Sequence, residues 1–216
     1  MTTTDWFMAN HWWWRPGWTV SRRFYTWHLA FADQSDVHRY VGAHRDVLTP
    51  LPGLDLIPDQ WLHLTMQGLG FTHEVDDYDV QAIIRAARSH LAALPPLQLT
   101  LPEVIVTPEA VVIPAQPAQD VVDLRRALRA AIAAVWPAVP ESADGFRPHL
   151  SVAYSNSTGP AEPVQQAIEN VTAAPATARI TTADLIVIHR DRKMYEWETV
   201  AARVAGAVDP AVTKRP

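Results

Sequence analysis

The sequence repeats one short polar pattern in two strand-like segments that lie about half the chain apart. The first segment is WLHLTMQ, residues 61–67, and the second is RPHLSVA, residues 147–153. Each contains a histidine, a leucine and then a hydroxyl residue, and the two histidines, His63 and His149, are 86 positions apart. This internal echo constrains the fold because it predicts two similar lobes, each contributing one such strand.

Side chains alternate across a β-strand, so each segment has one polar face and one apolar face. The residues predicted to share the polar faces are His63, Thr65 and Gln67 in the first strand, and Arg147, His149 and Ser151 in the second. The leucines between them are expected to pack into the core. If the lobes meet with these faces opposed, two histidines and two hydroxyls surround one cleft.

The remaining segments predict a mixture of strands and helices. We expect strands at 24–31 and within 97–115, helices at 33–48, 76–94, 119–136 and 160–172, and a hairpin at 183–204. This order indicates an α+β class. We predict a single bilobal domain at 24–204, an aromatic extension or flap at 1–23, and a flexible tail at 205–216.

Composition narrows the possible functions. Among 216 residues there is no cysteine, so thiolate metal sites and cysteine nucleophiles are excluded. The net charge of −5 argues against broad binding to duplex nucleic acid, but it allows a small anion or one end of an RNA. We see neither a signal peptide nor an apolar run long enough to span a bilayer, and no sign of an obligate protein partner. We therefore expect a cytoplasmic protein without membrane contact.

Paired histidines and hydroxyls suit displacement at phosphorus. One imidazole can remove a proton from the attacking oxygen while the other protonates the leaving oxygen. The hydroxyls can donate hydrogen bonds to the non-bridging phosphate oxygens. This chemistry needs no metal and no cofactor, and the sequence does not say which histidine takes which role.

The motifs HLTM and HLSV resemble the paired His-x-Thr/Ser signatures of the 2H phosphoesterase superfamily, in its branch of 2′-5′ RNA ligases and RNA 2′,3′-cyclic phosphodiesterases. The resemblance runs from about residue 24 to residue 202. It implies two pseudo-symmetric lobes of antiparallel sheet with outer helices and a central cleft. It also implies metal-independent hydrolysis of a 2′,3′-cyclic phosphate, on an RNA end or a nucleotide, to a 2′-phosphate. Some members join or cleave 2′-5′ linkages.

Under this resemblance His63 and His149 are the catalytic acid and base, and Thr65 and Ser151 bind the phosphate. An alternative of another class is a non-catalytic RNA- or nucleotide-binding module that retains the cleft. A metal-dependent hydrolase is disfavoured because no H-x-H or H-x-x-x-H pair occurs. The complete set of histidines and hydroxyls favours catalysis.

Several further residues are candidates for substrate contact. They are His28, Arg147, Gln67, Trp14 and Arg15. The segment HWWWRPGW, residues 11–18, can stack on a nucleobase while Arg15 meets phosphate, or it can be a flap that covers a sheet edge, and we favour the flap. His28 can equally be a structural histidine, and Arg147 a solvated charge at the end of a strand.

Three features receive a structural interpretation. The cluster HEVDD, residues 73–77, suggests a metal site, but its acidic residues stand where a helix should begin. The arginines of LRRALRA, residues 124–130, are expected on a solvated helix face, with RNA contact as a minor alternative. Tyr154 is predicted in the core, opposite His149.

Overall fold

Two four-stranded antiparallel sheets form the centre of the molecule in a computed structural model, which describes residues 6–204. The first sheet has the order β12-β11-β2-β4. Its strands are β2 (Phe24–Ala30), β4 (His63–Phe71), β11 (Thr182–His189) and β12 (Glu196–Val204). The second sheet has the order β3-β8-β7-β6. Its strands are β3 (Leu54–Leu56), β6 (Ile105–Val106), β7 (Ala110–Pro114) and β8 (His149–Ser155).

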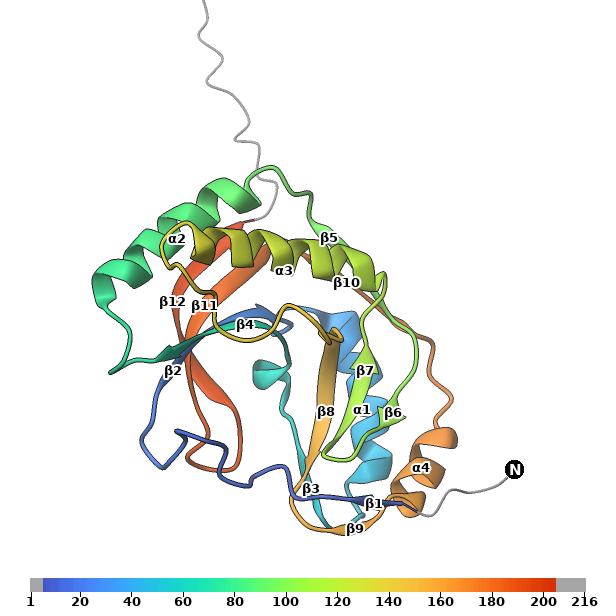
Figure 1. Ribbon diagram of the computed structural model, residues 1–216. Coiled ribbons are helices and arrows are strands. Elements are labelled where there is room, and N and C mark those ends of the chain that lie inside the picture. The colour runs from blue at the N-terminus through green and yellow to red at the C-terminus, as the bar shows by residue number, and fades with distance from the viewer. Residues whose placement is uncertain (1–5, 205–216) are drawn as a thin grey trace, which may run out of the picture.

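Helices cover the outer sides of the two sheets. They are α1 (Ser35–Leu48), α2 (Asp77–Leu91), α3 (Ala118–Ala133) and α4 (Glu162–Glu169). α2 and α3 pack on each other and against the first sheet, while α1 packs beside the second sheet and contacts α4 (Figure 1). The result is a bilobal α+β fold, which confirms the predicted class. β4 and β8, the strands with the repeated motif, belong to different lobes.

The chain crosses repeatedly between the lobes. After β2 in the first sheet it forms α1 on the second lobe, and after β4 and α2 on the first lobe it enters β6 and β7 of the second sheet. α3 then returns to the first lobe before β8. Neither lobe is therefore a continuous stretch of sequence.

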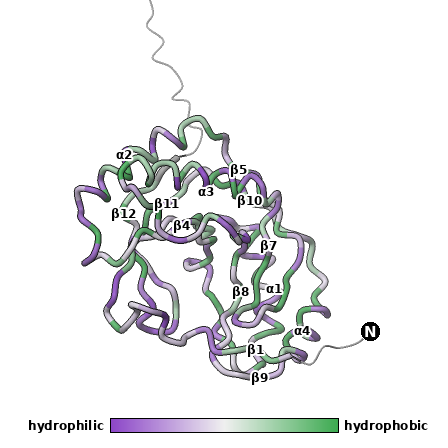
Figure 2. The backbone as a smooth tube through the Cα atoms, viewed as in Figure 1, coloured by the Kyte–Doolittle hydropathy of each residue, from purple (hydrophilic) through white to green (hydrophobic). Residues whose placement is uncertain are grey.

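Local sequence explains where the elements begin and which face they bury. Asp76 caps α2, because its carboxylate accepts a hydrogen bond from the backbone N–H of Tyr78 at 2.7 Å. The apolar residues of this helix recur at helical spacing and are buried: Val80, Ile83, Ile84, Ala87 and Leu91. Hydrophobic stretches within the elements alternate with hydrophilic turns (Figure 2). The helix start at HEVDD is thereby confirmed.

β-Bulges interrupt both strands that carry the motif. In β4, His28 pairs with Thr65 and Trp27 with Gln67, so Met66 is an extra residue in the ladder. In β8, the partners of Val112 and Val111 are Ser151 and Ala153, so Val152 is extra. An extra residue reverses the alternation of side chains beyond it. Predictions from strict alternation therefore hold only up to the bulge.

Four short strands have no counterpart in the sequence-based prediction: β1 (Phe7–Met8), β3, β9 (Gly159–Pro160) and β10 (Ala176–Ile180). β1 pairs with β9, β3 pairs with β8, and β10 pairs with the predicted strand β5 (Leu97–Leu101). No helix within residues 6–204 has the length and hydrophobicity needed to cross a bilayer. The predicted tail at 205–216 lies outside the described residues, as do residues 1–5.

Candidate active site

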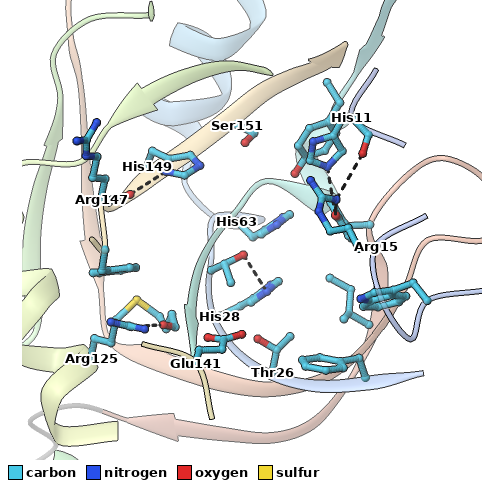
Figure 3. Close-up of a pocket in the computed structure, with 18 of the residues that line it drawn as sticks. His11, Arg15, Thr26, His28, His63, Arg125, Glu141, Arg147, His149 and Ser151 are labelled. Atoms are coloured by element: carbon cyan, nitrogen blue, oxygen red, sulfur yellow. Dashed lines mark hydrogen bonds between the residues drawn. The ribbon is translucent and has the colours of Figure 1, made fainter. Parts of the chain in front are cut away.

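A pocket of about 560 Å³ lies between the two sheets and is lined by residues from both. His63 and Thr65 reach it from β4, and His149 and Ser151 reach it from β8 (Figure 3). The fold thus brings the two polar pairs of the repeated motif to one cavity, although they are separated by half of the chain.

The two histidines are held in the same way by their own strands. Nδ1 of His63 donates a hydrogen bond to the carbonyl of Trp61, and Nδ1 of His149 donates to the carbonyl of Arg147, both at 2.8 Å. A carbonyl can only accept, so in the neutral imidazole the proton sits on Nδ1. The lone pair of Nε2 is then available for a reaction in the pocket.

Burial distinguishes the two histidines. His63 is only 7% exposed, whereas His149 is exposed to solvent at the start of β8. Burial is the main cause that lowers the pKa of His63 to about 4; the hydrogen bond to the Trp61 carbonyl opposes this shift, and the positive charge that His149 can carry adds to it. His63 is consequently neutral at neutral pH, with Nε2 able to accept a proton.

A third histidine lies beneath this pair. His28 on β2 is 1% exposed, and its ring is stacked parallel to that of His63 with 4.4 Å between ring centroids. Nε2 of His28 and Oγ1 of Thr65 are hydrogen-bonded at 3.2 Å. Burial holds the pKa of His28 well below its usual value. His28 thus lines the pocket as predicted, and its contacts fix the positions of His63 and Thr65.

A family model described as the 2′-5′ RNA ligase superfamily matches residues 33–192. The chain belongs to this superfamily. No curated protein sequence matches the chain significantly.

Solved structures with the same fold have low sequence identity to this superfamily member. TT0787 of Thermus thermophilus is 18% identical with a TM-score of 0.65, covering 86% of this chain and 99% of that protein. E. coli LigT in its apo form is 16% identical with a TM-score of 0.62, covering 86% and 98%. E. coli LigT complexed with 3′-AMP is 18% identical with a TM-score of 0.63, covering 85% and 98%. These likenesses confirm the fold.

The N-terminal segment, residues 6–23, borders the pocket and precedes the part of the chain that matches the superfamily. Arg15 lines the pocket, as predicted, and its guanidinium donates to the carboxylate of Glu109 at 2.7 Å and to the Tyr195 hydroxyl at 3.2 Å. Trp14 does not line the pocket, and the guanidinium of Arg190 lies over its ring. Trp18 stands in the pocket wall instead, and substrate contact by the exposed Trp14 stays a prediction.

The N-terminal segment also joins the two lobes. The indole Nε1 of Trp12 donates to Asp55 on β3 at 2.7 Å, and Arg190, just after β11, donates to the carbonyl of Trp13 at 2.8 Å. Trp12 is buried in the core. The segment therefore covers one side of the pocket and packs on both lobes.

The bulges explain two differences from the sequence-based prediction. Beyond Met66, Gln67 turns away from the pocket and is fully buried. Its amide donates to the carbonyl of Pro140 at 2.7 Å and accepts from Arg129 at 2.7 Å, so the prediction that it contacts substrate is wrong. Beyond the bulge in β8, Tyr154 is buried as predicted but lines the pocket rather than the opposite face.

Two arginines of α3 do not lie on the solvated face that the sequence predicts. Arg125 is 6% exposed and donates to the carbonyls of Met66, Ser142 and Ala143 at 2.8 to 3.0 Å. Arg129 donates to the carbonyl of Glu141 at 3.1 Å. These bonds hold the loop that precedes β8 against β4. Arg147 lies at the end of this loop, exposed and in the pocket lining, as predicted.

Glu141 and Tyr195 are pocket residues that strand periodicity does not reveal, because both lie in connecting segments. The hydroxyl of Tyr195 is hydrogen-bonded to Nε2 of His11 at 3.1 Å. Burial lowers the pKa of His11 to about 3, with Arg15 and Arg190 acting in the same direction. In the described part of the chain, no three His, Cys, Asp or Glu side chains are grouped to hold a metal ion.

Proposed function

We propose that this member of the 2′-5′ RNA ligase superfamily hydrolyses 2′,3′-cyclic phosphates to 2′-phosphates by metal-independent acid and base catalysis. The single observation that carries the proposal is the pocket itself, in which the His-x-hydroxyl pairs of two different sheets face one another. A binding module has no need of two imidazoles whose Nε2 atoms are both directed to one cavity. The substrate is an RNA end or a small cyclic nucleotide.

The different burial of the histidines assigns their roles in this proposal. His63 is the general base, because its lowered pKa leaves it neutral, and Nε2 takes a proton from water. The water oxygen attacks phosphorus, and the bond from phosphorus to O3′ breaks. His149, in its protonated form, gives its proton to O3′, so the phosphate remains on O2′.

The hydroxyls stabilise the transition state in this proposal. Thr65 and Ser151 approach from opposite lobes and donate to the non-bridging phosphate oxygens, whose negative charge is redistributed as the bonds exchange. His28 positions Thr65 through the bond to its Oγ1. The fold relative E. coli LigT has been crystallised with 3′-AMP and with phosphate, which supports a nucleotide phosphate as the ligand of this cleft.

Incubation with nucleoside 2′,3′-cyclic phosphates in EDTA tests the proposal. Phosphorus NMR should show the cyclic signal replaced by that of the 2′-monophosphate, with EDTA leaving the rate unchanged. Formation of the 3′-phosphate would contradict the assigned leaving group. Absence of turnover with all four common bases would contradict the proposed phosphodiesterase activity.

A further inference from the structure

One side of the pocket contains an acidic residue that the phosphate chemistry does not use. Glu141 lines the pocket and is exposed, in the loop between α3 and β8 (Figure 3). Its backbone has φ = 60°, a left-handed conformation that is unfavourable for a residue other than glycine. An anion in a phosphate-binding pocket is repelled by the substrate unless it contacts a different part of it.

The carboxylate of Glu141 is held in a fixed position over β4. Oε2 accepts hydrogen bonds from the backbone N–H of Gly68 and from the amide of Gln67, both at 3.2 Å. Within residues 6–204 these bonds both end on Oε2, so Oε1 keeps its capacity to accept. Arg125 and Arg129 donate hydrogen bonds to backbone carbonyls of this loop. The carboxylate of Glu141 is therefore an acceptor in a fixed position.

The aromatic ring of Phe24 lies close to Oε1 of Glu141. A Cβ added to Gly68 would lie 2.5 Å from Oε1 of Glu141 and 2.8 Å from the ring of Phe24. The carboxylate oxygen and the edge of the ring therefore converge above this glycine. Phe24 and Trp18 both line the pocket, with 5.6 Å between their ring centroids. A planar heterocycle placed here contacts an aromatic surface and meets a fixed acceptor at its edge.

This place is about one nucleoside away from the reacting groups. Thr65 pairs with His28 and Gly68 with Thr26, so two residue steps along β2 separate the two positions, which is roughly 7 Å at about 3.3 Å per residue. A nucleotide whose phosphate lies between the two histidines can place its base here, because the same pocket is lined by Phe24, Trp18 and Glu141. We propose that Glu141 selects guanine as the base of the substrate, an inference that rests on the proposed phosphodiesterase function.

The chemistry of the bases favours guanine. A carboxylate only accepts, with about four lone-pair sites, and two are occupied here by Gly68 and Gln67. Guanine presents two adjacent donors, N1–H and the N2 amino group, on its Watson–Crick edge. Adenine and cytosine pair one amino group with a ring nitrogen acceptor, and uracil has its N3–H between two carbonyls. Each of these puts an acceptor against the carboxylate.

The test compares kcat/KM for the 2′,3′-cyclic phosphates of guanosine, inosine, adenosine, cytidine and uridine. We expect guanosine to exceed adenosine, cytidine and uridine by about 10- to 100-fold, the range for a hydrogen bond to a charged group. Inosine lacks the N2 amino group and should be intermediate. Equal turnover of all five overturns the inference and leaves the phosphodiesterase intact.

Glu141→Gln separates base selection from a structural role. The variant should lower kcat/KM for guanosine about 10-fold or more, through KM, while the values for the other bases stay within about twofold. Asp144→Asn, in the same loop but outside the pocket lining, should change none of them. An equal loss for every base would mean that Glu141 only supports β4, and the inference would be wrong.

Binding provides a readout that does not depend on turnover. Isothermal titration should show guanosine 2′-monophosphate binding about 10-fold or more tightly than adenosine 2′-monophosphate, with the difference abolished in Glu141→Gln. Equal affinities overturn guanine selection, even if no cyclic phosphate is hydrolysed. Absence of hydrolysis together with selective binding contradicts the phosphodiesterase alone.

Discussion

His63 and His149 share their sequence context and their hydrogen-bond partner, yet they differ in their exposure to water. Each donates from Nδ1 to the carbonyl two residues earlier, so the strand itself fixes the tautomer. The stacked His28 and the surrounding core bury His63 but not His149. The sequence reveals the pair of residues, but this asymmetry comes from neighbours on another strand and could not be found from the motif.

Replacement of either histidine tests the paired assignment. His63→Ala and His149→Ala should each lower kcat by about 10²- to 10⁴-fold, the usual contribution of a positioned acid or base. Far-UV circular dichroism should show an unchanged fold. His90→Ala, at the exposed end of α2, serves as the matched control and should retain the full rate. Full activity in either site variant would refute the mechanism.

The lowered pKa of His63 predicts the acidic limb of the pH profile. A base must be unprotonated, so kcat/KM should fall as the pH drops through the pKa of His63 in the free enzyme, at about 4 rather than 6.5. Initial rates at subsaturating substrate, across a pH range that extends below the pKa of His63, measure this limb. An acidic limb centred at 6.5 or above would contradict the role of His63 as base.

At the scale of elements, the strands and helices with strong periodicity were predictable, and their interruptions were not. β2, α1, α2, α3 and the β11–β12 hairpin lie close to the positions expected from apolar spacing. The bulges at Met66 and Val152 leave no mark in that spacing, because buried residues occur on both faces of β4 and β8. They account for the different positions of Gln67 and Tyr154.

The arginines of α3 also occupy positions that sequence spacing did not predict, and their burial can be tested. Arg125→Met removes three hydrogen bonds to backbone carbonyls, so we expect the free energy of unfolding to fall by about 2–4 kcal/mol. Arg126→Met, on the exposed side of the same helix, should change it by less than about 0.5 kcal/mol. Urea denaturation measures both values. Equal effects would restore the interpretation of LRRALRA as a solvated face.

At the scale of the whole molecule, the interleaved path of the chain makes each lobe dependent on the other. The helix that follows β2 covers the opposite lobe, and each motif strand is preceded by a segment of the other lobe. The repeated motif predicted two lobes but not this exchange, which depends on long-range packing. This exchange supports the single domain proposed at 24–204, which stays a prediction.

Calorimetry tests whether the lobes unfold together. We expect one transition, with the calorimetric enthalpy equal to the van't Hoff enthalpy, because neither lobe has a continuous sequence that could persist alone. The 2′-monophosphate product, which bridges both motif strands in the proposed mechanism, should raise the midpoint progressively as its concentration exceeds Kd. Two resolved transitions would mean that the lobes are separate domains.

The N-terminal segment has a kinetic consequence. Trp12 is hydrogen-bonded to Asp55 on β3 of one lobe, and the carbonyl of Trp13 accepts a hydrogen bond from Arg190 of the other lobe. Rotation of the lobes away from each other must therefore break one of these hydrogen bonds. We therefore expect ligands to diffuse into a standing opening, without a preceding gate. Association should then follow second-order kinetics that do not saturate with ligand concentration.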